Sequence, residues 1–229
     1  MPDPSAILLA ALTGLISGLL LSMPIGPVNL TIINEGARRG FTQGMLVGLG
    51  ASVMELIYCT IAFTGFSSFF GDRMVKASME VFSFTFLLFL GMKFLTAKTA
   101  TAPTQPGTAA GIIEARVVEK FNPHSAFMTG FVRVLGNLGV LLFWIVLAAN
   151  FMSHDWVTDT FAAKSACIVG VALGTNLWFC GLSYCVSLGQ GRFSERTLVR
   201  VQRISGICLI AVGLFDGGHI IWQLTRHRI

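Results

Sequence analysis

The chain has 229 residues, of which 54% are hydrophobic and only 12% are charged. Soluble globular domains average about 25% charged residues, so this chain lacks the polar surface that a water-soluble protein needs. The composition predicts an integral membrane protein. The net charge of +5 does not indicate nucleic-acid binding, because the Lys and Arg residues lie between apolar stretches and form no continuous basic stripe.

Six stretches are apolar and long enough, or nearly long enough, to cross a bilayer, which takes about 20 residues in a helix. They predict an all-α polytopic membrane protein with six transmembrane helices in a single membrane domain, residues 1–229. The N-terminus carries Asp3 and no basic residue, so the first stretch is predicted to be a span rather than a signal peptide. The stretches are Ser5–Ile33, Gly44–Phe70, Val81–Leu95, Ser125–Met152, Ala162–Leu188 and Val201–Leu224.

The first stretch is interrupted within Ser22–Asn29, where Pro24 and Pro27 flank Gly26. Each proline removes an amide donor and clashes with the preceding turn, so the pattern predicts a broken helix. A restart with Pro27 near the first helical position would leave free amides at a positive dipole end, which suits a carboxylate. We interpret Pro24, Gly26, Pro27 and Asn29 as substrate-binding residues, the alternative being a simple proline kink.

Glu55 lies well inside the second span. A carboxylate at that depth costs at least about 2.5–3.5 kcal/mol unless it is paired, hydrated or protonated. Glu55 is therefore predicted to be an ion-coupling residue that carries a proton or the ammonium of a substrate. Asp216, deep in the sixth span, is a second ion-coupling candidate, although a contact with His219 or Asn176 would equally make it a packing device.

The only linker-like segment comprises residues 97–123, which open with Thr, Ala, Pro and Gly and are predicted to lie in the cytoplasm. The segment separates residues 5–95 from residues 125–224, each with three spans. Related halves with an odd number of spans must have opposite orientations, as in the inverted repeats of many secondary transporters. A weak similarity between Gly48–Tyr58 and Gly170–Phe179 favours such a 3+3 repeat.

The fourth span carries a second interruption, in which Gly136 and Gly139 flank Asn137. Helices one and four would then both be broken, at corresponding places in the two halves. Asn137 is a further substrate-binding candidate, and Asn176, in the fifth span, is the last. Arg133 shares a helix face with Asn137 and either contacts the substrate or extends to the lipid headgroups.

The distribution of Lys and Arg predicts the orientation, because basic loops stay in the cytoplasm. Ten of these residues follow spans one, three and five, and five lie on the opposite side, which predicts that both termini are outside. The ten are Arg38, Arg39, Lys93, Lys98, Arg116, Lys120, Arg192, Arg196, Arg200 and Arg203, and the five are Arg73, Lys76, Lys164, Arg226 and Arg228.

Several motifs occur together along nearly the whole chain. They are Pro24–Asn29, the basic Gly36–Gly40 segment, Gly44, Gly48–Gly50, Glu55, Leu90–Lys93, Phe131–Phe143, Trp178 and Gly206–Gly213. With these motifs the sequence resembles the LysE/RhtB superfamily of amino-acid exporters. The resemblance implies a six-span transporter of the bacterial inner membrane rather than an enzyme. It also implies no cofactor, and export of amino acids or similar small solutes driven by an ion gradient.

Other functions are weighed against this one. The chain has no G-x-x-x-x-G-K-[ST] sequence, so ATP is not predicted to drive transport directly. A divalent metal-ion exporter is an alternative, with Glu55, Asp216 and His219 as ligands of unfamiliar spacing. A membrane thiol-disulfide electron carrier would need a facing pair such as Cys59 and Cys180. The expected partners are a small-molecule substrate and the lipid bilayer, with no nucleic acid or bound metal and with a homodimer left open.

Overall fold

The computed structural model describes residues 3–65, 73–96, 109–188 and 195–226. Within these ranges the chain forms nine helices and no strand, as the predicted all-α class requires. The helices are α1 (Pro4–Ser22), α2 (Pro27–Arg39), α3 (Phe41–Gly65), α4 (Arg73–Leu95), α5 (Ala109–Phe121), α6 (Ala126–Gly136), α7 (Leu138–Ser153), α8 (Phe161–Leu188) and α9 (Glu195–Arg226).

Two helix starts follow directly from their sequences. The carboxylate of Asp3 accepts a 3.0 Å hydrogen bond from the amide of Ser5, and Pro4 stands where no amide donor is needed. Hydrogen bonding from Ser5 lowers the pKa of that carboxyl. Ser125 caps α6 in the same way by accepting from the amide of Met128 at 3.2 Å. Local capping therefore fixes where α1 and α6 begin.

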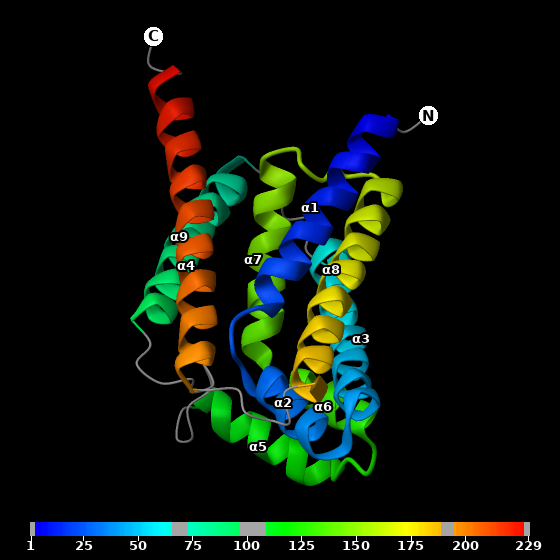
Figure 1. Ribbon diagram of the computed structural model, residues 1–229. Coiled ribbons are helices and arrows are strands. Elements are labelled where there is room, and N and C mark those ends of the chain that lie inside the picture. The colour runs from blue at the N-terminus through cyan, green and yellow to red at the C-terminus, as the bar shows by residue number, and fades with distance from the viewer. Residues whose placement is uncertain (1–2, 66–72, 97–108, 189–194, 227–229) are drawn as a thin grey trace.

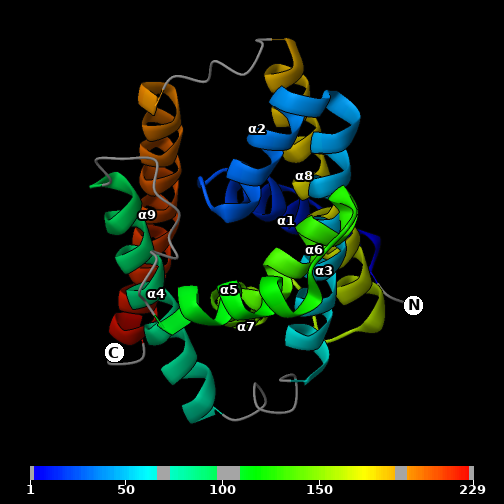
Figure 2. The ribbon, with the colours of Figure 1, turned by 90° about the horizontal axis from the view of Figure 1, so that it is seen from below.

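The long helices run side by side, and the pair α4–α9 stands along one side of the group formed by α1, α3, α7 and α8 (Figure 1). The first turn of α1 and the last turn of α9 lie at the same end. Short helices α2, α5 and α6 gather at the opposite end. Seen from that end, α5 stretches from the side of α4 to α6 (Figure 2). Residues 97–123, which we expected to be a linker, thus include a helix that packs on α6.

In the part of the chain that the structure describes, three helices are long and apolar enough to cross a membrane, namely α1, α3 and α8. The pair α6 and α7 passes the same test jointly and is bent by 68°. Helix α4 is longer than the predicted third span, because it continues the apolar Phe84–Leu95 segment back to Arg73. Leucines on α1 and α8, such as Leu8 (60% exposed) and Leu177 (61% exposed), point outward, where acyl chains would cover them.

Glycines let three helix pairs approach closely. Gly14 and Gly18 of α1 meet the backbone of α8, and Gly170 and Gly174 of α8 meet the backbone of α1. Gly50 of α3 and Gly130 of α6 make the same kind of mutual contact, as do Gly91 of α4 and Gly206 of α9. Small residues are the usual means of close helix packing in lipid, where no hydrophobic effect drives helices together.

The contact of α6 with α3 gives a stability prediction. A Cβ at position 130 would overlap the carbonyl oxygen of Val47. Gly130→Ala should therefore destabilise the protein by about 1–3 kcal/mol, the usual penalty for overpacking. Gly181→Ala is the matched control, because no atom lies within 4 Å of the added methyl group. Thermal unfolding of the purified variants in detergent measures both, and equal melting temperatures would contradict the packing argument.

Candidate functional site

The predicted break in the first span is confirmed. Helix α1 ends at Ser22 and α2 begins at Pro27, with extended backbone at Gly26 (φ −116°, ψ −176°). The expected span Ser5–Ile33 thus consists of two helices, because two prolines around one glycine cannot continue the hydrogen-bond ladder.

The side chain of Asn29 holds this break together. Its amide group donates to the carbonyl oxygens of Ser22 at 2.8 Å and Pro24 at 2.7 Å, two acceptors on the far side of the break. Its own carbonyl oxygen accepts a 3.2 Å hydrogen bond from the indole of Trp178 on α8. Asn29 is only 3% exposed. Both amide donors of a residue that we predicted to bind substrate are thus used within the protein.

The amides at the start of α2 are different. The first intrahelical bond runs from the amide of Leu30 to the carbonyl of Gly26 at 3.0 Å. Pro27 has no amide hydrogen, and the amides of Val28 and Asn29 have no acceptor among the described residues. Unpaired amides at the positive end of a helix dipole are suited to an anion.

The second break lies at Asn137, as predicted. Asn137 ends α6 and precedes α7 with a non-helical backbone (φ −95°, ψ 80°), and the two helices meet there at 68°. The amide of Asn137 donates to the carbonyl of Val134 at 2.9 Å. Close to this point, Gly136 packs against the backbone of Glu114 on α5.

Tyr58 of α3 provides the hydrogen-bond donor for a carbonyl group at this second break. Its hydroxyl donates to the carbonyl oxygen of Leu135 at 2.8 Å. Tyr58→Phe should lower the free energy of unfolding by about 1–3 kcal/mol, because it leaves a buried acceptor without a donor. Tyr184→Phe, at the other tyrosine of the chain, is the control, since Tyr184 is 56% exposed. Thermal unfolding of both variants measures the difference. If Tyr58→Phe unfolds at the same temperature as the wild type, the hydroxyl of Tyr58 does not stabilise the break.

Both breaks open onto one cavity of about 320 Å³. Pro24, Gly26, Pro27 and Asn29 line it from the first break, and Asn137 lines it from the second. Glu55 of α3 also lines it, as does Lys93 in the last turn of α4. The remaining wall is mostly apolar: Leu21, Val28, Phe86, Leu90, Phe94, Val140, Phe143, Trp144, Phe179 and Leu209.

Glu55 makes no hydrogen bond or ion pair with any residue that the structure describes. Its side chain is half-buried and faces the cavity. A carboxylate in the membrane interior normally has a partner, since an unpaired charge there is costly. The cavity is therefore where a cationic group or a proton would meet this side chain.

The other candidate residues lie elsewhere. The amide group of Asn176 donates to the hydroxyl of Ser52 at 2.8 Å and to the carbonyl of Ala172 at 2.7 Å, and Asn176 is not part of the cavity wall. Arg133 pairs with the buried Glu114 of α5 at 3.5 Å rather than extending to headgroups. Asp216 lies on α9, but its side chain is outside the described part of the structure.

The described residues do not form the arrangements that a metal-ion exporter or a thiol-disulfide electron carrier would need. Within the described residues, no three His, Cys, Asp or Glu side chains gather as metal ligands. The side chain of His219 lies outside those residues. All five cysteines are free, and neither Cys59 nor Cys180 lines the cavity.

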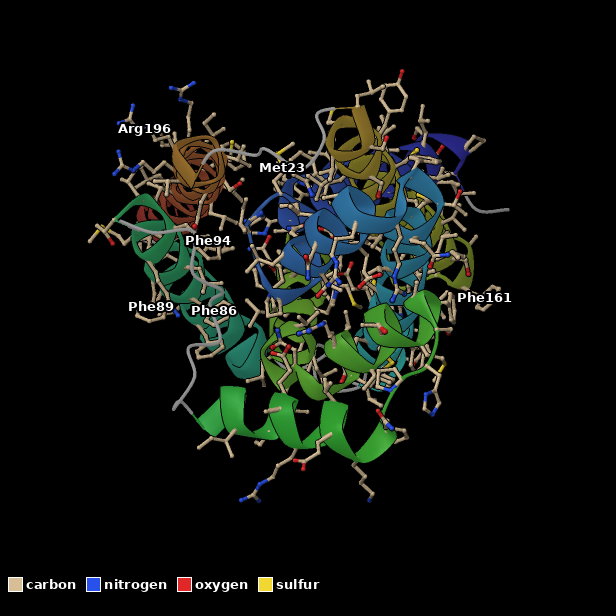
Figure 3. The ribbon with its side chains drawn as sticks, turned by 60° about the horizontal axis from the view of Figure 1, so that its bottom comes forward. Met23, Phe86, Phe89, Phe94, Phe161 and Arg196 are labelled. Carbon is tan, nitrogen blue, oxygen red and sulfur yellow. The ribbon has the colours of Figure 1, made fainter. Side chains whose placement is uncertain are left out.

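Sequence reasoning missed the contribution of α4. We counted Lys93 as a topology marker and as part of the Leu90–Lys93 motif but not as a site residue, yet it lines the cavity together with Phe86, Leu90 and Phe94. The spacing of these residues, at four, seven and eight positions from Phe86, places them on one helix face and is a signal that the sequence does carry. Figure 3 shows Phe86 and Phe94 on the side of α4 that faces the other helices, whereas Phe89 points away.

A second cavity of about 470 Å³ lies between α1, α7 and α9. Its wall is almost wholly apolar and includes Leu9, Ile16, Phe151 and Phe215. It shares Leu21 of α1 and Leu209 of α9 with the first cavity. These two leucines therefore line both the cavity at the breaks and the second cavity, which extends toward the first residues of α1.

Comparison with known proteins accounts for this arrangement. The family model for LysE type translocators matches residues 19–215, which include both breaks, Glu55 and Lys93. The chain belongs to this family. It is also 26% identical over 213 residues to a protein of Bacillus subtilis (strain 168) named "Putative amino acid efflux protein YcgF", covering 93% of this chain and 97% of that protein. No solved structure matches the chain.

Proposed function

We propose that this protein exports amino acids, or similar small solutes, across the cell membrane. The observation that carries the proposal is the cavity at the two breaks, which brings together a carboxylate and helix amides that have no partner among the described residues. Membership of a translocator family and the name of the Bacillus subtilis relative support the same function.

The ends of an amino acid match the polar groups of the cavity. The amides of Val28 and Asn29 bind the carboxylate, and Glu55 binds the ammonium. Pro24, Gly26 and Pro27 act by holding the break open, since a continuous helix would use those amides internally. Asn137 lines the opposite wall and interrupts the second helix.

Transport uses an ion gradient, with protons the proposed ion. A proton and a substrate ammonium compete for the same carboxylate of Glu55, so each displaces the other and the two move in opposite directions. A proton that enters across 100 mV supplies about 2.3 kcal/mol, and each pH unit adds about 1.4 kcal/mol. These amounts suffice to accumulate a solute outside.

Six crossings and an inverted 3+3 repeat are part of the proposal. In each half a broken helix is followed by two unbroken ones: α1 with α2 precedes α3 and α4, and α6 with α7 precedes α8 and α9. The glycine contacts support this plan, because the broken helix of each half packs on the second helix of the other half. The first turn of α1 and the last turn of α9 lie at the same end of the molecule, as an even number of crossings requires.

The orientation follows as a prediction. A single cysteine at Arg200 should react with a membrane-impermeant maleimide only from the cytoplasmic side, and one at Arg226 only from outside, because most basic residues lie at the end that contains Arg200. Labelling of right-side-out and inverted vesicles measures this. A cytoplasmic position 226 would contradict the predicted orientation, and together with an external N-terminus it would require an odd number of crossings and remove the inverted repeat.

Counterflow into proteoliposomes tests the function itself. Purified protein should exchange at least one labelled amino acid from a panel that covers apolar, hydroxylated, acidic and basic side chains. The same vesicles are tested with divalent cations. Counterflow of a cation without any amino acid would replace the proposed function with metal export.

A further inference from the structure

We propose that the substrate is a neutral amino acid with a bulky apolar side chain, bound as a zwitterion between Glu55 and Lys93. This inference rests on the proposed function and narrows it to one class of amino acid. It also assigns Lys93 as a binding residue.

The charge of the cavity wall favours a zwitterion. Among the described residues that line the cavity, Glu55 is the acidic side chain and Lys93 is the basic one. They come from different helices, α3 and α4, with the start of α2 lining the same space. The ammonium of the substrate neutralises Glu55, and its carboxylate is shared by Lys93 and the α2 amides. A third charge on the substrate would then enter an apolar space without a counter-ion, which is strongly unfavourable.

The wall around these charges is aromatic. Phe86 of α4 contacts Phe143 of α7 with ring centroids 6.0 Å apart, and Phe143 meets Trp144 at 6.5 Å. Both separations lie in the range of favourable aromatic pairs. These three rings form a continuous aromatic surface between α4 and α7. Phe179 of α8, which is 1% exposed, lines the same cavity. Such a surface favours an aliphatic or aromatic side chain.

Hydroxyl groups have little to bind in this wall. Ser22 is the one serine or threonine among the described residues that line the cavity, and its hydroxyl already donates to the carbonyl of Gly18 at 2.7 Å. Asn137 is then the amide side chain left in the wall that could bond a hydroxyl, and a threonine side chain would leave the aromatic part of the wall unfilled. The volume of about 320 Å³ lies at the lower end of ligand pockets, which suits one amino acid better than a peptide.

Competition in the counterflow assay tests the substrate class. Leucine and phenylalanine should exchange at rates at least about tenfold above those of lysine, glutamate and threonine, given that apolar contacts discriminate by roughly 10- to 200-fold. Equal or faster exchange of lysine, glutamate or threonine overturns this inference and leaves amino-acid export standing. Absence of exchange for every amino acid overturns the proposed function as well.

Lys93 is tested with a substrate pair that differs only in the carboxylate. Lys93→Met should weaken phenylalanine binding by about 10- to 100-fold, as expected for losing a charged hydrogen bond. It should leave phenethylamine, which has no carboxylate, bound as in the wild type. Lys93→Arg should retain phenylalanine binding, and Lys120→Met, on the exposed face of α5, is the control. Equal weakening of both ligands would mean that Lys93 only supports the fold, and unchanged phenylalanine binding would exclude it from the site.

Discussion

Replacing Glu55 with glutamine should reduce amino-acid exchange by about 10- to 100-fold, the loss expected when a charged hydrogen bond is removed from a binding site. The substitution preserves the shape of the side chain and removes the carboxylate that we propose to hold an ammonium or a proton. The protein should still insert and purify, because Glu55 has no hydrogen bond or ion pair to any described residue. Proteoliposome counterflow at several pH values measures the effect.

The control for this variant is Glu119→Gln on α5, which removes a carboxylate from an exposed position outside the cavity. It should exchange substrate as the wild type does. Wild-type exchange by Glu55→Gln, with the same pH profile, would remove Glu55 from both binding and coupling. Asp216→Asn is expected to have a milder effect than Glu55→Gln.

Replacing Pro24, Ile25, Gly26 and Pro27 with four alanines should eliminate binding of a substrate that carries a carboxylate. Alanine has the highest helix propensity, so α1 and α2 would join into one helix and the amides of Val28 and Asn29 would enter its hydrogen-bond ladder. Two measurements on the purified variant check this prediction. Binding of labelled substrate should be lost, and the helix content should rise.

Four alanines at Val169, Leu173, Leu177 and Leu188 form the matched control. These side chains of α8 are 58–67% exposed and line neither cavity. The control should bind substrate normally. Normal binding by the variant at the break, with a continuous helix, would show that the free amides do not hold the carboxylate.

The breaks could be predicted because they depend on local chemistry. Two prolines around a glycine interrupt a helix whatever surrounds them, and the structure starts α2 at Pro27 as expected. The depth of Glu55 was likewise visible from its place within an apolar stretch. Tests of substrate contact remain for Pro24, Gly26, Pro27, Asn29, Asn137 and Asn176.

What the sequence did not disclose depends on contacts between distant segments. Trp178 bonds to Asn29 across 149 positions, and Tyr58 reaches Leu135 across 77. Such pairs are set by how helices pack, for which hydropathy carries no information. The position of Lys93 in the cavity wall was missed for a different reason. A basic residue at the end of a span is usually explained by the orientation of the protein in the membrane, so its sequence position gave no sign of a second role.

The hydrogen bonds of Asn29 and Tyr58 have a consequence for how the protein moves. Both breaks are tied to neighbouring helices by these hydrogen bonds, so we expect them to act as fixed corners rather than hinges. If the α2 amides bind substrate as proposed, binding then loses little free energy to ordering the site. The motion that exposes the cavity to either side must then occur at a looser boundary. The pair α4–α9 offers one, since α9 has few contacts with α1 and α4 meets the other helices mainly at α7. Rocking of this pair would move Leu209 relative to Leu21, the two leucines that line both cavities.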